Sequence, residues 1–284
     1  QVLNRATDGL NSVAGLGGNA VQVFDPAAVD RAEEERMQRW VELIGSALAG
    51  DGFVLHYQPV LSLVGEPSER YDAFLRLDNN GELVPPSIFL GIAEEHGLLA
   101  EINRWVARQA IGVIGQRRRE GHTTHISVRI SPESFTDPRF IETVASELQA
   151  QSVPGAQLLL QVPEAKVFTH LRSAQQFLSA ISALGCKVGL EQFGSGLDSA
   201  QLLSHFKPDF IKLDRSFTAD FAQLREQQAK IEAITARASE DGITTIAEFV
   251  SDAPSMSQLF TAGVHYVQGE FVGPVQAQMD FEFG

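Results

Sequence analysis

Short apolar segments alternate with amphipathic helical segments along most of this chain, and no other feature limits its possible folds as much. From Phe53 onward, apolar residues first run together and then recur at helical spacing. Strands that alternate with helices form a parallel sheet, because each helix returns the chain to the same edge. We therefore expect an α/β fold, and about eight strands predict closure into a TIM-like (β/α)8 barrel. The expected strands are Phe53–Val60, Tyr71–Leu77, His125–Ile130, Leu158–Val162, Lys187–Leu190, Phe210–Leu213, Thr244–Phe249 and His265–Val267.

Helical spacing also occurs ahead of the barrel. Trp40 and Ile44 fall on one face of a segment that runs from Ala27 to Leu48 and ends at Gly50-Asp51-Gly52. Between and after the strands, the expected helices are Glu101–Arg119, Ser131–Ala150, Arg172–Leu184, Phe217–Glu240 and Pro254–Ala262.

The first residues differ in pattern from the rest. Glycines interrupt residues 1–28, where the one expected strand is Val21–Phe24. We therefore divide the chain into a segment from a preceding domain (1–28), a linking helix (29–50) and a barrel domain (51–284). Because the chain begins at Gln1 rather than Met, we expect it to be a fragment of a longer protein.

The charge balance limits the possible partners. The chain has 22 Lys and Arg against 36 Asp and Glu, a formal net charge of −14. Nucleic-acid polymers and anionic membranes bind basic surfaces, so we expect neither as a partner. No apolar run approaches the length of a membrane span. The single cysteine, Cys186, cannot form an internal disulfide, which favours a reducing, cytoplasmic location.

Polar residues follow the expected strands, at the edge where parallel barrels place their sites. Cations and carboxamides are mixed there with scattered carboxylates. A pair of divalent hard cations needs a carboxylate cluster, so this mixture suits a phosphate ligand better. The residues at this edge are Arg76, Arg129, Gln161, Glu164, Glu191, Gln192, Lys212, Asp214, Glu248, Phe249, Gln268 and Glu270.

Seven short motifs occur in order between Phe53 and Pro274. They are Tyr57-Gln58-Pro59, Asp72-Ala73-Phe74-Leu75-Arg76, Ser127-Val128-Arg129-Ile130-Ser131, Glu191-Gln192-Phe193-Gly194-Ser195-Gly196, Lys212-Leu213-Asp214, Ala247-Glu248-Phe249-Val250 and Gln268-Gly269. Together they resemble the successive motifs of the EAL family of cyclic di-GMP phosphodiesterases, which implies a TIM-like barrel of EAL type. Gly17-Gly18-Asn19 and Phe24-Asp25-Pro26 resemble the end of a GGDEF domain, so residues 1–28 are interpreted as its C-terminal remnant.

The chain departs from active EAL enzymes at positions that the resemblance assigns to metal ligands, while Lys212, Glu248 and Gln268 match. Arg129 is the sharpest departure, because a guanidinium can bind a phosphate bidentately but cannot generate hydroxide. The resemblance therefore predicts a degenerate EAL domain that has no catalytic residues, needs no metal or other cofactor and is not an enzyme. The departures are Asp72 in place of Glu, Arg129 in place of Asn, Gln161 in place of Glu, Glu191-Gln192 in place of two Asp, and Ser251 in place of Glu.

The same combination resembles the FimX-type group of degenerate EAL domains, which are cyclic di-GMP receptors. The resemblance implies that Phe74, Leu75 and Arg76 cradle one half of the ligand. It also implies that Phe249 and Phe271 stack on or enclose a guanine, whose N–H edge would be bound by Glu248. The implied binding residues are Gln58, Phe74, Leu75, Arg76, Ser87, Asn103, Arg129, Glu248, Phe249, Gln268, Phe271 and Pro274.

Simpler interpretations of these residues stay open. The aromatic rings could belong to the core. Arg76 and Arg129 could be structural ion-pair partners of Glu191 or Asp72. The histidines show no metal-ligand spacing, and we interpret them as structural.

The sequence therefore leaves three possible functions. The leading hypothesis is an inactive cyclic di-GMP receptor that relays the signal to a partner. The resemblance implies a PilZ-domain protein as that partner and control of type IV pili. The alternative is a weak metal-dependent phosphodiesterase that forms pGpG, supported by Lys212 and Glu248. A scaffold that binds protein and no nucleotide is the third, although Phe74 and Arg76 remain in place.

Overall fold

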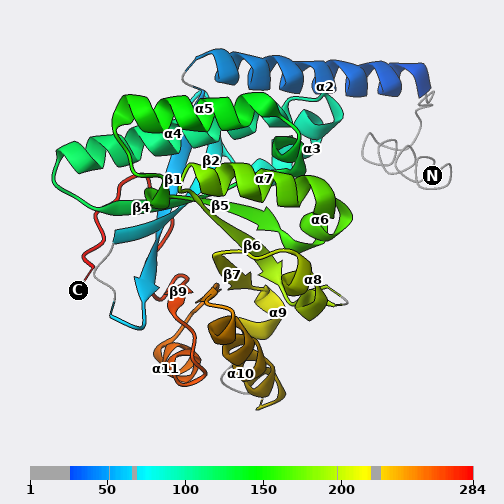
Figure 1. The fold of residues 1–284 in the computed structure, drawn as a ribbon. Helices are drawn as coiled ribbons and strands as arrows, with labels where there is room; N and C mark the ends of the chain where they lie inside the picture. Colours follow the sequence, from blue (N-terminus) through cyan, green and yellow to red (C-terminus); the bar gives the residue numbers. More distant parts are fainter. Residues whose placement is uncertain (1–25, 51, 66–68, 197, 219–224, 284) are drawn as a thin grey trace.

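In the computed structural model, which describes residues 26–50, 52–65, 69–196, 198–218 and 225–283, eight strands close into a barrel (Figure 1). A ninth strand, β3 (Glu82–Val84), lies outside the barrel and extends β2 as a hairpin. The TIM-like barrel expected from the alternating pattern is confirmed. The barrel strands are β1 Phe53–Ser62, β2 Glu69–Asn79, β4 Thr124–Arg129, β5 Leu158–Pro163, β6 Lys187–Phe193, β7 Phe210–Leu213, β8 Thr244–Ala247 and β9 Tyr266–Gln268.

Strand β1 departs from the expected arrangement, in which all strands are parallel. It pairs antiparallel with both β2 and β9 and so closes the barrel between them. The link from β1 to β2 spans only residues 63–68. This link is too short for a helical crossover, which parallel neighbours require. The prediction of an entirely parallel barrel was therefore wrong at β1.

The helices agree with the expected segments in most places, with two differences. The segment expected at Ser131–Ala150 is a 3-10 turn, η1 (Pro132–Phe135), followed by α5, because Pro138 starts a new helix that is capped by the Asp137 carboxylate. Part of the segment expected at Phe217–Glu240 lies outside the described residues. The helices are α2 Pro26–Ala49, α3 Pro86–Glu95, α4 Leu99–Arg119, α5 Pro138–Gln151, α6 Glu164–Thr169, α7 Leu171–Ala183, α8 Ser199–His205, α9 Arg215–Thr218, α10 Arg225–Glu240 and α11 Ala253–Thr261, with a second 3-10 turn, η2, at Gly155–Gln157.

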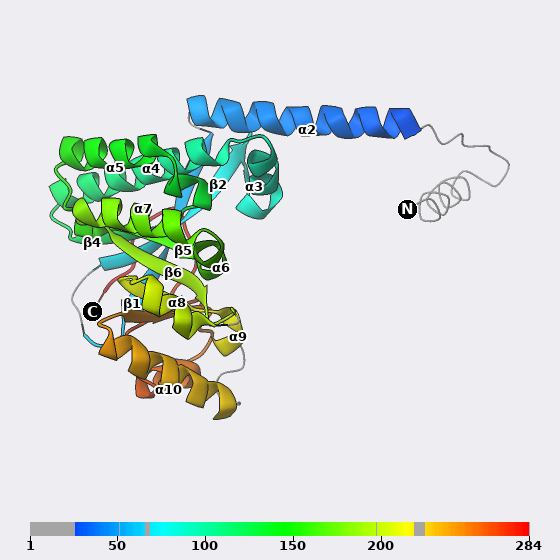
Figure 2. The ribbon, with the colours of Figure 1, turned by 45° about the vertical axis from the view of Figure 1, so that its right-hand side comes forward.

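Helix α2 covers the barrel with its C-terminal part only (Figure 2). Ile44 and Ala47 are buried there in the main hydrophobic core, whereas the N-terminal part of the helix extends beyond the barrel. The strand expected at Val21–Phe24, and almost all of the segment 1–28, lie outside the described residues. Within the described residues, no helix combines the length and apolar character needed to cross a membrane.

The C-terminal segment that follows β9 is hydrogen-bonded to β1 and packs against β2. Tyr57 and Gln276 exchange two backbone hydrogen bonds, with N–O distances of 2.7 and 2.9 Å. Farther along, the ring of Phe283 packs edge-on against Tyr71, 5.2 Å between centroids. The segment therefore contacts both strands that the short link 63–68 joins.

One layer inside the barrel depends on a glycine. Gly189 on β6 lies opposite Phe210 on β7, and a Cβ at Gly189 would come within 2.2 Å of the Phe210 ring. Phe210 packs with Val60, Leu159 and Ile246 in a buried cluster. The missing side chain makes the space that the ring occupies.

We expect Gly189→Ala to destabilise the fold by about 1–3 kcal/mol, because the added methyl group would overlap the buried Phe210 ring. Gly112→Ala on α4, where a Cβ meets nothing within 4 Å, is the matched control and should be neutral or stabilising. Urea unfolding of both variants measures the difference. Equal stabilities would contradict the packing of this layer.

Candidate functional site

A buried ammonium group lies at the end of the barrel where the parallel strands finish, which we call the mouth. Lys212 on β7 is fully buried, and its Nζ donates to three acceptors from three other parts of the barrel. These are the Asp72 carboxylate on β2, Glu248 Oε1 at 3.0 Å, just after β8, and Gln268 Oε1 at 2.8 Å on β9. All three donor positions of the ammonium are therefore occupied.

The charges around Lys212 keep it protonated. Burial alone would lower the pKa of Lys212, but Asp72 and Glu248 raise it above the ordinary lysine value. A raised lysine pKa stabilises the fold at every pH below the ordinary lysine pKa, and this contribution is lost only as pH rises through the folded-state value. At neutral pH the ion pairs are therefore fully formed.

A second cation, Arg129 on β4, pairs with Glu191 on β6 through its Nε. The Glu191 side chain is 3% exposed and that of Arg129 is 57% exposed. Burial raises the pKa of Glu191, and the positive charge of Arg129 opposes this rise. The sequence left open whether Arg129 is a structural ion-pair partner, and the structure shows that it pairs with Glu191. The exposed part of the guanidinium still faces the mouth.

Buried amides connect the remaining polar groups. Gln161 Nε2 on β5 donates to Asp72 Oδ1 at 2.9 Å. Gln268 Nε2 donates to Gln58 Oε1 at 2.9 Å, and Gln58 Nε2 donates to the Gly273 carbonyl at 2.9 Å. Both Gln58 and Gln268, predicted as ligand contacts, therefore form the floor of the mouth.

The arrangement does not fit the metal pair that the EAL resemblance implies for active members. Asp72 is bound by an ammonium and an amide N–H, and Glu191 by a guanidinium. A metal ion would have to displace these donors or share with them oxygens whose charge Lys212 and Arg129 already neutralise. Across the described residues, no group of three or more His, Cys, Asp or Glu side chains is arranged to hold a metal ion.

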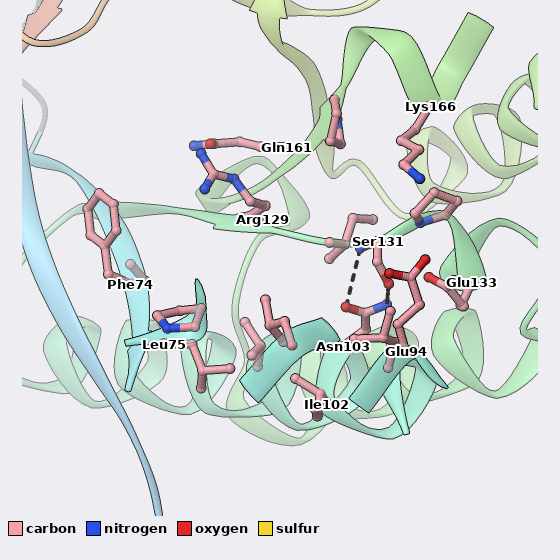
Figure 3. A pocket seen from close by; sticks show the side chains of 18 of the residues that line it. Phe74, Leu75, Glu94, Ile102, Asn103, Arg129, Ser131, Glu133, Gln161 and Lys166 are labelled. Carbon is pink, nitrogen blue, oxygen red and sulfur yellow. Dashed lines mark hydrogen bonds between the residues drawn. The ribbon is translucent and has the colours of Figure 1, made fainter. Parts of the chain in front are cut away.

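A pocket of about 290 Å³ opens beside the mouth, between β2, β4, α3 and α4 (Figure 3). Phe74, Leu75, Asn103 and Arg129, four of the predicted ligand residues, line it. Ser87 lies on α3 next to the lining residue Pro86 and is exposed. The structure thus brings residues from distant motifs to one cavity.

Asn103 has a structural task in this pocket. Its Nδ2 donates to the hydroxyls of Ser131 and Ser134, both at 2.7 Å. Its Oδ1 accepts from the Ser131 backbone N–H at 3.3 Å. Both amide hydrogens are thereby used to hold α4 against the β4–η1 turn. Only a lone pair on Oδ1 is left for a ligand.

Two exposed aromatic rings stand on the opposite side of the mouth. Phe249 is 52% and Phe271 45% exposed, so these rings do not belong to the core. Phe249 has φ +63°, which is rare for a bulky residue and marks a constrained position. Gly269 permits this backbone, because a Cβ there would lie 2.3 Å from Val250 N.

Arg215 is a residue of this rim that the sequence interpretation missed. Its Cζ lies 5.0 Å from the centroid of the Phe249 ring, a cation–π contact. The position directly after the Lys212-Leu213-Asp214 motif was the available signal. Arg76 makes a longer cation–π contact, with its Cζ 5.9 Å from the centroid of the Phe74 ring. Its Nη1 also donates to the backbone carbonyl of Leu75 at 2.8 Å.

The predicted ligand residues therefore divide into three groups. Gln58 and Gln268 lie in the floor, and Glu248 contacts Lys212 above them. The pocket side and the aromatic rim hold the others. Pro274 is exposed, directly after the Gly273 carbonyl that anchors Gln58. The pocket residues Glu94, Glu133 and Lys166 were not predicted, since none of them lies in one of the seven motifs.

Comparison with known proteins identifies the family. The EAL domain model matches residues 42–275, so the chain belongs to the EAL domain family. The FimX EAL domain of Xanthomonas citri, solved in complex with c-diGMP, is 61% identical with a TM-score of 0.87, over 89% of this chain and 100% of that one. The FimX EAL domain of Pseudomonas aeruginosa, bound to c-di-GMP, is 33% identical with a TM-score of 0.81, over 86% of this chain and 99% of that one.

Curated relatives are longer than this chain. Signaling protein YkoW of Bacillus subtilis is 29% identical over 81% of this chain and 29% of its own length. Cyclic di-GMP phosphodiesterase PdeB of Shewanella oneidensis is 25% identical over 92% of this chain and 31% of its own length. The chain thus spans about three tenths of either relative.

Replacing Lys212 tests the centre of the mouth. We expect Lys212→Met to destabilise the fold by about 3–5 kcal/mol at neutral pH, because it leaves Asp72 and Glu248 buried without their cation. Urea unfolding measures the loss, with Lys187→Met, a half-exposed lysine at the start of β6, as control. Equal losses in the two variants would contradict the proposed cause.

Proposed function

We propose that this EAL domain binds cyclic di-GMP across the barrel mouth without metal ions and does not hydrolyse it. One observation carries the proposal. The carboxylates Asp72, Glu191 and Glu248 are held by the chain's own cations, Lys212 and Arg129. The two FimX EAL domains that this chain resembles were solved with cyclic di-GMP bound, which supports the choice of ligand.

The ligand has two guanines and two phosphates, and the mouth offers two matching sides. One guanine would enter the pocket beside Phe74 and Leu75. The other would stack at the rim formed by Phe249 and Phe271, because purine faces stack well on aromatic rings. The exposed guanidinium of Arg129, between the two sides, would bind phosphate oxygens in place of metal ions.

The same contacts explain why hydrolysis should not occur. Attack on a phosphodiester needs an activated water, and activation needs a bound metal or a free base. Lys212 is protonated and donates to three acceptors, so it cannot take up a proton. Glu191 is occupied by Arg129. We therefore place the chain among degenerate, non-catalytic EAL domains.

The wider role follows from the resemblance alone. We propose that binding is relayed to a partner protein in the cytoplasm, a PilZ-domain protein that acts in type IV pilus control. In this proposal residues 1–28 are the end of a GGDEF-like domain, 29–50 the linking helix and 51–284 the degenerate EAL barrel. Pull-down with a PilZ-domain protein, with and without cyclic di-GMP, tests the relay.

A weak metal-dependent phosphodiesterase is the second candidate. Lys212 and Glu248 match the pattern of active members, and several curated relatives, including PdeB and PdeF, are cyclic di-GMP phosphodiesterases. Incubation with Mg²⁺ or Mn²⁺ followed by chromatography for pGpG distinguishes the candidates. Sustained turnover would favour the enzyme over the receptor.

Calorimetry with cyclic di-GMP tests the leading proposal directly. We expect the same affinity in EDTA and in excess Mg²⁺, because Lys212 and Arg129 already neutralise the acids that metal ions would bind. Binding that requires Mg²⁺ would contradict the proposal. No binding in either buffer would favour a scaffold that binds no nucleotide.

A variant of Arg129 tests its role in binding. Arg129→Ala combined with Glu191→Gln removes the guanidinium without leaving a buried unpaired carboxylate. We expect affinity for cyclic di-GMP to fall roughly 10- to 100-fold, the range for a lost charged hydrogen bond. Glu191→Gln alone and Arg36→Ala on α2 are the controls. Unchanged affinity would limit Arg129 to a structural role.

A further inference from the structure

The pocket beside the mouth has apolar walls and an acidic end. Leu75, Leu99, Ile102 and Val106 are among its apolar lining residues. Figure 3 shows Glu94 from α3 and Glu133 from the η1 turn reaching into one side of the pocket, next to Asn103 and Ser131. A carboxylate only accepts hydrogen bonds, so this end of the pocket offers acceptors to a ligand.

One of these acceptors lacks a partner. Glu133 Oε2 is shielded from solvent and accepts no hydrogen bond from any described residue. Leaving such an atom unpaired costs free energy, which a bound donor would recover. Asn103 cannot supply the donor, because both its amide hydrogens are taken by Ser131 and Ser134. In the described part of the chain, neither Glu94 nor Glu133 forms a salt bridge with Lys166 or any other cation.

We propose that Glu94 and Glu133 recognise the guanine in this pocket, by accepting from its N1–H and N2–H₂ edge. The inference rests on the proposed function and adds residues that set base specificity. A flat aromatic base fits between aliphatic walls, and its donor edge meets the two carboxylates at the acidic end of the pocket.

The choice of guanine follows from hydrogen-bond chemistry. Guanine presents two adjacent kinds of donor, N1–H and the N2 amino group, along its pairing edge. Adenine presents an N1 lone pair at the corresponding place, and this lone pair would face a carboxylate oxygen. Two acceptor-only side chains therefore favour guanine and reject adenine.

A glycine on α3 keeps the pocket open. Gly91 is one of the lining residues, and a Cβ placed there meets nothing within 4 Å. It lies one helical turn before Glu94 and so on the same face of α3. A larger side chain at this position would occupy the space of the base without disturbing the helix backbone.

The test is calorimetry with three cyclic dinucleotides that carry guanine, hypoxanthine or adenine. Hypoxanthine is guanine without the N2 amino group. We expect Glu133→Gln and Glu94→Gln each to lower affinity for the guanine ligand roughly tenfold. Both variants should also narrow the preference for guanine over hypoxanthine. Glu95→Gln, an exposed neighbour on α3 outside the pocket, should change neither quantity.

A blocking variant gives a second readout. Gly91→Leu should abolish binding, whereas Gly45→Leu on α2, where a Cβ also meets nothing within 4 Å, should leave it intact. Urea midpoints close to that of the wild type confirm that the variants fold. If the wild type binds no cyclic di-GMP, the proposed function fails together with this inference. If the wild type binds but the glutamate and Gly91 variants keep its affinity and preference, only the inference fails.

Discussion

The polar architecture of the mouth depends on one buried ammonium group. Lys212 connects strands β7, β2 and β9 and the residue after β8, and no solvent reaches it. A buried charge is tolerated only when its donors are all satisfied, so Asp72, Glu248 and Gln268 are fixed in direction. Gln161 donates to Asp72, and Gln58 donates to the Gly273 carbonyl and accepts from Gln268. The orientations of these two side chains are therefore set as well. The floor on which a ligand would rest is therefore rigid before any ligand arrives.

The charge balance of the mouth explains how an acidic protein could hold a dianionic ligand. Among the described residues, three central carboxylates, Asp72, Glu191 and Glu248, pair with two cations, Lys212 and Arg129, which leaves one net negative charge. Phosphates would therefore be held by two exposed arginines, Arg129 and Arg215, and by the half-buried Arg76. Because guanidinium groups carry fixed charge at all physiological pH values, such binding would not depend on metal supply.

The sequence predicted the barrel, the positions of its strands and the edge that carries the polar residues, because alternation and strand ends are local properties. The direction of β1 was missed, since it depends on the length of one link and on which neighbours β1 joins. The Arg129–Glu191 pair was considered but left open, because two residues 62 positions apart meet only in three dimensions. Glu133 was overlooked because it fell in a segment expected to be one long helix, and Arg215 because it lies in a one-turn helix that has no periodicity to detect.

If the chain's own cations occupy the place of metal ions, Mn²⁺ should not bind at the mouth. The electron paramagnetic resonance signal of free Mn²⁺ can be followed as protein saturated with cyclic di-GMP is added. We expect the free-ion signal to stay unchanged, because Asp72, Glu191 and Glu248 are paired with Lys212 and Arg129. A loss of signal in proportion to the protein, reaching one or two ions per chain, would contradict it.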